Sequence, residues 1–512
     1  MKIGILELLL DTVDSKSTNT MFARLFRRLQ YSIMPQVIAV WCRSLGHQVH
    51  YATYYGQCDP TDLLPAGLDY VFIATYTQAS ALAHALGLYY RLKGAVTVAG
   101  GPHAKAFPDE CQRFFDIVVR DCNKELIDDI LSGRVDAPAI VSSRPLTEFP
   151  SVEERLPEIA VSTLSRGRAT RLSLISILAS TGCPYDCDFC SDWNTAYRAV
   201  PTERLSADLN FISRNFPGAL VAYHDPNFAV RFDETMDVIE SIPQDRRNSY
   251  VMESSLAILK DSRLERLRRT RCAFVAPGVE SWGDYGNKAG TRSLQGQAKL
   301  DSVVTKFERL HEYVPGLQAN LLFGTDLDCG DEPVELTKEF MRRLPYVWPG
   351  VNIPTPYGGT PLYERYLEQG RILPNMPVSL YFAPYLVTTL KHYDPLEYYD
   401  HLISIYEVMT SGRMLVNRLR ARAPIYVRLA HILRTLSMRK ELAEQRRVRH
   451  MLATDRDFRA FHEGQLVKLP EFYHRIFEQQ LGRYARLIPR QDRTPLPRQH
   501  TKHRRAAMAV HH

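Results

Sequence analysis

Short apolar runs and helical stretches alternate over the first 133 residues of the 512-residue chain. This alternation predicts parallel strands joined by crossover helices, because parallel neighbours need a long connection. The strands are expected at Lys2–Leu8, Gln48–Thr53, Asp69–Thr75, Ala95–Ala99 and Asp116–Val119, with helices at Met34–Leu45, Ala79–Leu92 and Lys124–Leu131. Residues 1–133 are therefore predicted to form an α/β domain with a doubly wound parallel sheet. Such sheets bind ligands at the carboxyl ends of their strands.

A second alternating series begins after a proline-containing segment, residues 134–170, which lacks regular periodicity and is typical of a linker. The series predicts six strands, at Leu172–Ala179, Leu220–Tyr223, Tyr250–Met252, Ala273–Ala276, Gln318–Phe323 and Tyr346–Ile353. Six strand–helix units are too few for a closed barrel of eight units. We therefore expect a partial (β/α)6 barrel, open on one side, over residues 171–390.

Helical patterns dominate after residue 390. The predicted helices are Leu396–Met409, Arg413–Leu433 with a break at Pro424, and Leu436–Leu452. They predict a helical C-terminal domain over residues 391–487. The remaining residues, 488–512, are basic and contain too little apolar surface to fold alone, so a disordered basic tail is expected.

The predicted helix at Arg413–Leu433 has a basic amphipathic face, because its arginines interleave with apolar residues. The arginines are Arg418, Arg420, Arg422, Arg428 and Arg434. A packed helix with a solvated basic side is the favoured interpretation. A helix that contacts a membrane surface or an acidic partner is the alternative, so peripheral membrane contact stays open.

Composition indicates a reducing compartment. The chain has nine cysteines at irregular spacings and no secretory signal pattern, which argues against a disulfide framework and for a cytoplasmic protein. No run approaches the ~18 apolar residues of a membrane-spanning helix. The net charge of +7 is mild for this length, and we expect no nucleic-acid partner.

Three cysteines, Cys183, Cys187 and Cys190, lie within eight residues, with no fourth nearby. Structural zinc requires a closed shell of four ligands, so these three cysteines fit zinc poorly. Iron–sulfur clusters are held by thiolates. A four-iron cluster on three thiolates has one iron that is free to bind another ligand.

The spacing Cys-x3-Cys-x2-Cys, with Phe189 before the last cysteine and an apolar strand directly before the loop, resembles the radical S-adenosylmethionine enzymes. The resemblance implies a [4Fe-4S] cluster whose free iron binds the amino and carboxylate groups of S-adenosylmethionine. It also implies that the reduced cluster cleaves this cofactor to methionine and a 5′-deoxyadenosyl radical. A reductant such as flavodoxin or ferredoxin would then be a partner.

Polar segments at the ends of later predicted strands support this resemblance. They are Tyr223–Phe228, Met252–Ser255 and Pro277–Ser281. In the family, polar groups at such positions contact S-adenosylmethionine. The resemblance therefore implies a cofactor-binding set of Phe189, Asp225, Asn227, Glu253, Ser255, Glu280 and Ser281. An ordinary surface-loop side chain is the alternative for any one of them.

The N-terminal domain resembles the cobalamin (B12)-binding module of one class of this family, through Leu45–Val49, Thr75–Ser80 and Ala99–His103. The implied cobalamin contacts are Thr75, Gln78, Ser80, Gly100, Gly101 and His103. The usual Asp-x-His-x-x-Gly, whose histidine ligates cobalt, is absent, and the first strand continues into Leu9–Ser15. Either cobalamin binds without a protein imidazole, which we favour, or the domain holds no corrinoid. His103 is the residue to check as an exception.

The function expected from the resemblance is cobalamin-dependent methyl transfer to an unactivated carbon of a small or lipid-like metabolite. One alternative is a radical enzyme without corrinoid that catalyses a rearrangement, cyclisation or oxidation. Another is a methylthiotransferase, whose additional cluster would need thiolates from among Cys42, Cys58, Cys111 and Cys122. A non-catalytic iron–sulfur sensor or scaffold would need a fourth local ligand. The sequence identifies no catalytic side chain beyond those that hold cofactors.

Overall fold

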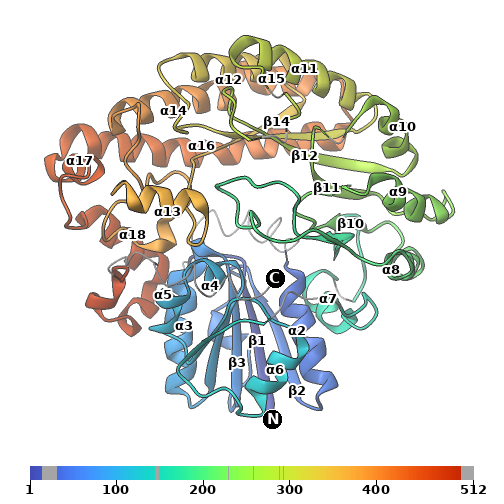
Figure 1. The fold of residues 1–512 in the computed structure, drawn as a ribbon, viewed down its shortest axis with the longest axis vertical. Coiled ribbons are helices and arrows are strands. Elements are labelled where there is room, and N and C mark those ends of the chain that lie inside the picture. The colour runs from blue at the N-terminus through green and yellow to red at the C-terminus, as the bar shows by residue number, and fades with distance from the viewer. Residues whose placement is uncertain are drawn as a thin grey trace.

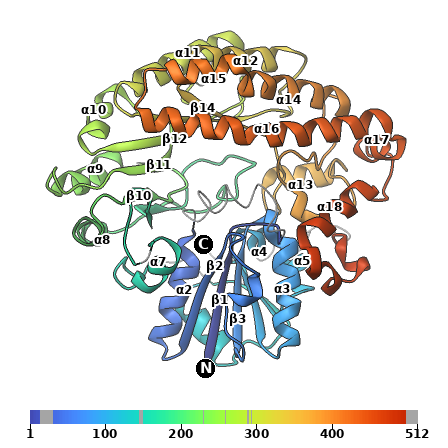
Figure 2. The ribbon, with the colours of Figure 1, turned by 180° about the vertical axis from the view of Figure 1, so that it is seen from behind.

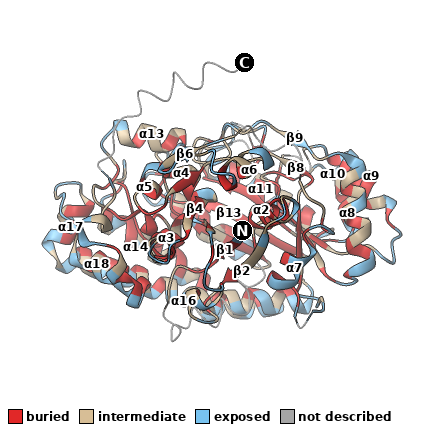
Figure 3. Ribbon diagram, turned by 90° about the horizontal axis from the view of Figure 1, so that it is seen from below, coloured by how far each residue is buried: buried red, intermediate tan, exposed pale blue. Residues whose placement is uncertain are grey.

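The structure is a computed structural model that describes residues 1–496, except 14–30, 144–148, 166, 229, 258, 287–288 and 292. It contains two six-stranded parallel sheets and a helical C-terminal region (Figure 1). The α/β class and the order of the three parts predicted from the sequence are confirmed. Figure 3 shows that the strands of both sheets are mostly buried.

The first sheet has the strand order β2-β1-β3-β4-β5-β6, and every neighbouring pair is parallel. Its strands are β1 (Lys2–Leu8), β2 (Gln48–Tyr54), β3 (Tyr70–Thr75), β4 (Val96–Gly100), β5 (Ile117–Val119) and β6 (Ala139–Val141). Helices α2 (Ile33–Ser44) and α6 (Lys124–Leu131) cover one face, and α3 (Ser80–Leu92), α4 (Pro102–Ala106) and α5 (Pro108–Gln112) cover the other. The strand order reverses between β1 and β3, where doubly wound sheets bind ligands.

The apolar run of β1 arises because the strand is buried on both faces. Ile3 and Ile5 pack under α2, whereas Leu6 and Leu8 pack under α3. Glu7 interrupts this pattern and is 1% exposed. Its carboxylate accepts hydrogen bonds from the backbone N–H of Ser32, at 2.6 Å, and from the hydroxyl of Tyr51, at 3.0 Å. Burial nevertheless raises the pKa of Glu7 to about 7.

Glu7→Gln should make the stability of the protein less sensitive to pH. The stability that the raised pKa of Glu7 contributes is fully present below pH 4.5 and is lost as the pH rises through about 7. At pH 8, the neutral glutamine should therefore stabilise the fold by up to about 3 kcal/mol, and near pH 4.5 by almost nothing. Thermal midpoints at both pH values measure this. The exposed Glu368→Gln is the control, and an equal gain for Glu7→Gln at both pH values would contradict the assignment.

The second sheet is the partial barrel, with the strand order β14-β13-β12-β11-β10-β7 and parallel pairing throughout. Its strands are β7 (Leu174–Ile177), β10 (Leu220–Tyr223), β11 (Tyr250–Ser255), β12 (Cys272–Glu280), β13 (Gly316–Leu322) and β14 (Val347–Asn352). Its helices are α8 (Thr202–Asn215), α9 (Phe232–Ser241), α10 (Asp261–Arg269), α11 (Gly296–His311), α12 (Glu332–Arg343) and α13 (Pro361–Glu368). All six predicted strands are present, and β7 and β14 form the two edges.

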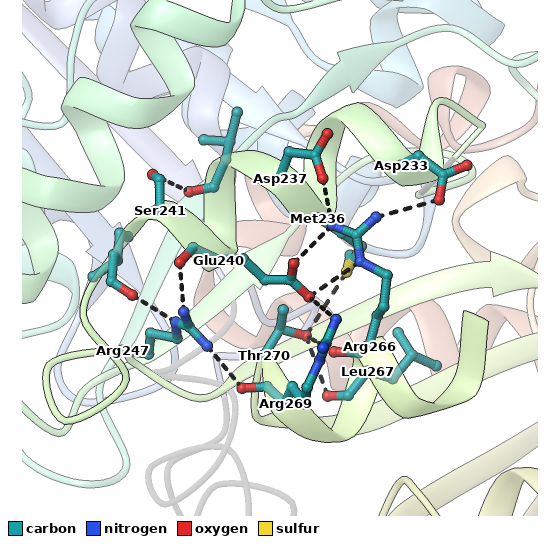
Figure 4. Close-up of polar contacts among 12 residues, drawn as sticks. Asp233, Met236, Asp237, Glu240, Ser241, Arg247, Arg266, Leu267, Arg269 and Thr270 are labelled. Atoms are coloured by element: carbon teal, nitrogen blue, oxygen red, sulfur yellow. Dashed lines mark hydrogen bonds and ion pairs between the residues drawn. The ribbon is translucent and has the colours of Figure 1, made fainter. Parts of the chain in front are cut away.

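An ion-pair network joins α9 to α10 on the outside of the barrel (Figure 4). The Arg266 guanidinium donates to Glu240 at 2.9 Å and also binds Asp237, while Arg269 donates to Glu240 at 3.0 Å. These partners lower the pKa of Glu240 against the opposing effect of burial. The network fixes the two helices relative to each other.

The segment 134–170, expected to be an irregular linker, contains two regular elements. Its first part adds β6 to the edge of the first sheet, and Leu156–Ser162 forms helix α7. The expectation was wrong at these places because elements of three and seven residues are too short to show periodicity. Arg155, just before α7, is buried and donates to Gln36 and to the Ser176 carbonyl, which joins the first domain to β7.

The C-terminal region contains α14 (Pro395–Thr410), α15 (Gly412–Arg420), α16 (Ile425–Thr454), α17 (Arg456–His462) and α18 (Glu471–Leu481). The predicted break at Pro424 is present. The two helices predicted on either side of residue 435 form one helix, α16, because no glycine or proline interrupts it. Among the described residues, no helix is both long and apolar enough to cross a membrane.

The end of the described chain packs against the N-terminal domain, and Figures 1 and 2 both show α18 beside α3. Phe477, Leu481 and Ile488 belong to the same apolar core as α3, and Arg113 forms an ion pair with Asp492 at 2.9 Å. The predicted disorder is therefore wrong for residues 488–496, because the apolar surface that they lack is supplied by α3. Residues 497–512 lie outside the described part of the chain.

Candidate functional site

The cysteine loop lies between the short strands β8 (Ser180–Thr181) and β9 (Arg198–Ala199), just beyond the carboxyl end of β7. Cys183 and Cys187 are buried and Cys190 is half-buried. The Cys183 N–H donates to the Thr195 carbonyl at 3.2 Å, and the Cys190 N–H donates to the Cys187 carbonyl at 3.0 Å. The backbone of the loop is thus fixed by its own hydrogen bonds, and its three thiols lie at the edge where a barrel gathers its site.

A side-chain network around Asp188 attaches this loop to the rest of the barrel. The Asp188 carboxylate accepts hydrogen bonds from Tyr285 at 3.0 Å and from Arg365 at 2.7 Å, and its carbonyl accepts one from the Leu362 N–H at 2.9 Å. Phe189 stacks on Tyr285 with ring centres 5.5 Å apart. Sequence reasoning missed Asp188, Tyr285 and Arg365, although Asp188 stands inside the cysteine motif.

Asp225 supports the strand that leads into the cysteine loop. Its carboxylate accepts hydrogen bonds from the Ala179 N–H at 3.1 Å and the Ser180 hydroxyl at 2.6 Å. Burial raises the pKa of Asp225 to about 6. The structure therefore places this predicted cofactor contact as a residue that positions residues 179–180.

Asn227 is 1% exposed, and neither its amide oxygen nor its amide nitrogen has a hydrogen-bond partner among the described residues. Leaving both groups unpaired costs about 1–3 kcal/mol each, so Asn227 is a candidate to hydrogen-bond a polar ligand or a buried water. The nearby end of β11 carries two other predicted contacts. Ser255 is buried within 3.4 Å of the Tyr185 hydroxyl of the cysteine loop, and Glu253 is exposed.

Asn227→Ala should weaken S-adenosylmethionine binding by about 10- to 100-fold and leave the iron content unchanged, because one or two hydrogen bonds to the ligand are lost. Equilibrium binding to the anaerobically reconstituted protein measures the affinity. Asn210→Ala on α8, whose amide bonds to the Ser206 carbonyl, is the matched control. Wild-type affinity in the Asn227 variant, with its iron intact, would remove Asn227 from the site.

Glu280 and Ser281 lie at the carboxyl end of β12, where the register with β13 shifts. Glu280 is buried and has a φ of 68°, a conformation that is strained for glutamate. The Ser281 hydroxyl donates to Asp328 at 2.9 Å, and Asp328 also accepts the Gly324 and Thr325 N–H groups. Ser281 thus joins the ends of β12 and β13, and a cofactor contact for Glu280 and Ser281 stays a prediction.

The loops predicted to contact cobalamin lie side by side at the carboxyl edge of the first sheet. Gly101 has a φ of 92°, and a Cβ there would lie 3.0 Å from the Thr75 carbonyl, so only glycine fits this close approach. Gly100 and Gln78 are half-buried, and the buried Ser80 hydroxyl has no partner among the described residues.

His103 points into the domain interior. The side chain is fully buried, its Nδ1 lies 3.4 Å from the Thr77 hydroxyl, and its ring centre is 5.4 Å from that of His84. Burial lowers the pKa of His103 to about 3, so the ring is neutral. The imidazole is therefore not presented on the surface that a corrin would contact.

The two ligand-binding edges meet through the loop after β14. A Cβ on Gly358 would clash with the carbonyl of Ala106 at the end of α4, and Phe107 packs edge-on against Tyr363 of α13. The same loop contacts the cysteine loop, since the Trp193 indole donates to the Gly359 carbonyl at 2.9 Å. The first sheet, the β14 loop and the cysteine loop therefore form one continuous structure.

The cysteines considered for an additional cluster are divided between different parts of the N-terminal domain. Cys42 lies in the core under α2, whereas Cys111 lies in the core on the opposite face of the sheet. Cys122 packs against the same core as Cys42, under α2, and Cys58 is exposed. This division disfavours the methylthiotransferase alternative.

A partial barrel with a three-cysteine loop after its first strand, preceded by a doubly wound domain, is the arrangement expected from the resemblance to radical S-adenosylmethionine enzymes with an N-terminal cobalamin-binding-like domain. Comparison with known proteins confirms this resemblance and indicates that the chain is an enzyme. It is 25% identical over 399 residues to bacteriochlorophyllide d C-8(2)-methyltransferase of Chlorobaculum tepidum, covering 74% of this chain and 85% of that protein. It is 26% identical over 247 residues to hopanoid C-3 methylase of Methylococcus capsulatus, covering 47% and 45%. No family model matches the chain.

Two solved structures share the fold. The cobalamin-dependent S-adenosylmethionine radical enzyme OxsB, solved with aqua-cobalamin, has a TM-score of 0.58 and 11% identity, covering 95% of this chain and 80% of that one. The radical S-adenosylmethionine methyltransferase TsrM from Kitasatospora setae, solved with tryptophan and a cofactor analogue, has a TM-score of 0.55 and 13% identity, covering 88% and 100%. At these low sequence identities, the structural similarity is evidence for the fold alone.

Proposed function

We propose that the chain is a cobalamin-dependent radical S-adenosylmethionine methyltransferase that methylates an unactivated carbon of a small or lipid-like metabolite. The observation that carries the proposal is the meeting of the two ligand-binding edges. The loop after β14 contacts both α4, at the carboxyl edge of the first sheet, and the cysteine loop. A cofactor held by the first domain would thus lie next to one held by the barrel.

The residues of the cysteine loop fit a [4Fe-4S] cluster on Cys183, Cys187 and Cys190. Thiolates are the ligands of such clusters, and three of them leave a coordination position for S-adenosylmethionine. When bound, the cluster supplies the electron that cleaves this cofactor, after reduction by a protein such as flavodoxin or ferredoxin. Asp188 holds the loop against Arg365, and the amide of Asn227, which has no partner among the described residues, would offer hydrogen bonds to the cofactor.

The carboxyl edge of the first sheet fits cobalamin. Gly101 lets the two loops of this edge approach closely, and the half-buried Gly100 and Gln78 lie on these loops. When bound, the corrinoid supplies the methyl carrier. The inward-facing His103 supports binding without a protein imidazole as the lower cobalt ligand.

The names of the relatives support the substrate class, since they refer to a bacteriochlorophyllide and to a hopanoid. The choice of carbon would be made by side chains around the β14 loop, which stands between the two cofactor positions.

Reconstitution with hydroxocobalamin tests the proposal. The protein should retain one corrinoid per chain beside its cluster, and paramagnetic resonance of the Co(II) form should show no nitrogen splitting from the protein. Nitrogen splitting that disappears in His103→Ala would contradict binding without a protein imidazole. Loss of all corrinoid from protein with an intact cluster would contradict methyl transfer and favour a radical rearrangement or oxidation.

A further inference from the structure

Helix α15 and the first half of α16 expose a set of large apolar side chains, here called the α15–α16 face. They are Val416, Leu419, Ile425, Tyr426, Leu429, Leu433 and Leu436, and each is 42–58% exposed. On α16 the members Ile425, Leu429, Leu433 and Leu436 repeat at the spacing of one helical face. Figure 2 shows α15 and α16 side by side on the outside of the molecule.

The opposite side of the two helices is already packed. Val427, His431 and Thr435 of α16 are buried. The guanidinium groups of Arg418 and Arg434 lie 4.8 Å and 4.4 Å from the ring of Trp348 on β14. These two arginines, expected on a solvated basic face, therefore point inward. A helix that is apolar on both sides is normally covered on both sides.

The charge around the α15–α16 face has one sign. Residues 411–440 contain no Asp or Glu, and their basic residues are Arg413, Arg418, Arg420, Arg422, Arg428, Arg434, Arg439 and Lys440. Arg413, Arg420, Arg422, Arg439 and Lys440 are exposed, and none forms an ion pair with a described acidic side chain. Farther along α16 the arginines are paired, as Arg446 is with Glu407 and Arg449 with Asp400.

We propose that the α15–α16 face docks this enzyme on the surface of an anionic lipid bilayer. Apolar side chains in the centre of a helical face, with basic side chains around them, are the pattern of helices that lie in a membrane interface. Anionic headgroups neutralise the unpaired arginines while the leucines enter the acyl boundary. A second copy of the chain would bring two basic surfaces together, and a nucleic acid would leave the apolar centre uncovered. The inference does not rest on methyl transfer.

Sedimentation of the full-length protein with vesicles tests the proposal. Binding should be strong on phosphatidylcholine vesicles that contain phosphatidylglycerol, weak on pure phosphatidylcholine, and reduced by high salt. Arg420→Gln with Arg422→Gln should weaken partitioning by about 10- to 30-fold. Leu429→Gln with Leu433→Gln should weaken it by at least about tenfold. Iron content and circular dichroism show that the variants remain folded.

Two matched control variants change residues outside this face. Arg214→Gln with Arg246→Gln removes two exposed positive charges near α8 and α9, and Leu92→Gln with Val467→Gln removes two apolar side chains that are 76% and 60% exposed. Both controls should bind vesicles like the wild type. Equal losses in the controls, equal binding to neutral vesicles, or no binding to anionic vesicles would overturn the proposal. A dimer in solution that the Leu429 and Leu433 changes dissociate would also overturn it, because the face would then join two copies.

Discussion

Replacing any one of Cys183, Cys187 and Cys190 by Ala should remove the iron–sulfur cluster and abolish formation of 5′-deoxyadenosine from S-adenosylmethionine. With only three thiolates in the loop, the loss of one leaves too few ligands to hold four irons. Iron and sulfide content and the visible absorption of anaerobically reconstituted protein measure the cluster. A chemical reductant and product analysis measure the cleavage.

The exposed cysteines Cys58 and Cys329 provide the controls. Their Ala variants should retain both the cluster and the cleavage. A variant with Ala at all three motif positions that still assembled a cluster and cleaved S-adenosylmethionine would refute the assignment.

Gly182→Ala should also lose most of the cluster, although it removes no ligand. Gly182 has a φ of 68°, and a Cβ there would clash with the Ala196 carbonyl and lie 2.6 Å from the Thr195 carbonyl. Both are backbone atoms, and Thr195 accepts the hydrogen bond of the Cys183 N–H. The added methyl group therefore forces the two sides of the cysteine loop apart, and iron per chain after reconstitution measures the result.

Gly218→Ala is the control variant, because it places alanine at a positive φ without causing a clash. Gly218 has a φ of 82°, but a Cβ there would meet no atom of the described residues within 4 Å. This variant should lose only about 1 kcal/mol of stability and keep its iron. Wild-type iron content in Gly182→Ala would show that the loop can relax around the methyl group.

The strands of both sheets could be predicted because parallel strands buried on two faces give continuous apolar runs, as in Lys2–Leu8. The cysteine motif could be predicted because its residues are adjacent in the chain. The contacts that position this motif could not, since Asp188 and Arg365 are 177 residues apart and meet only through the fold. The order of residues 488–496 was missed for a similar reason, because their apolar partner is α3 at the other end of the chain.

Because α18 packs against α3, the C-terminal region is attached to the N-terminal domain as well as to the barrel. Gln480 contacts Asp11, and Arg113 binds Asp492, while the barrel is joined to the first domain separately through Arg155 and α7. A hinge opening between the first sheet and the barrel must therefore break the α18 attachment, the α7 attachment or the contact of the β14 loop with α4. Truncation before α18 would expose the α3 core and leave the first domain held only by α7 and the β14 loop, so the isolated N-terminal domain is a poor substitute for the full chain in binding studies.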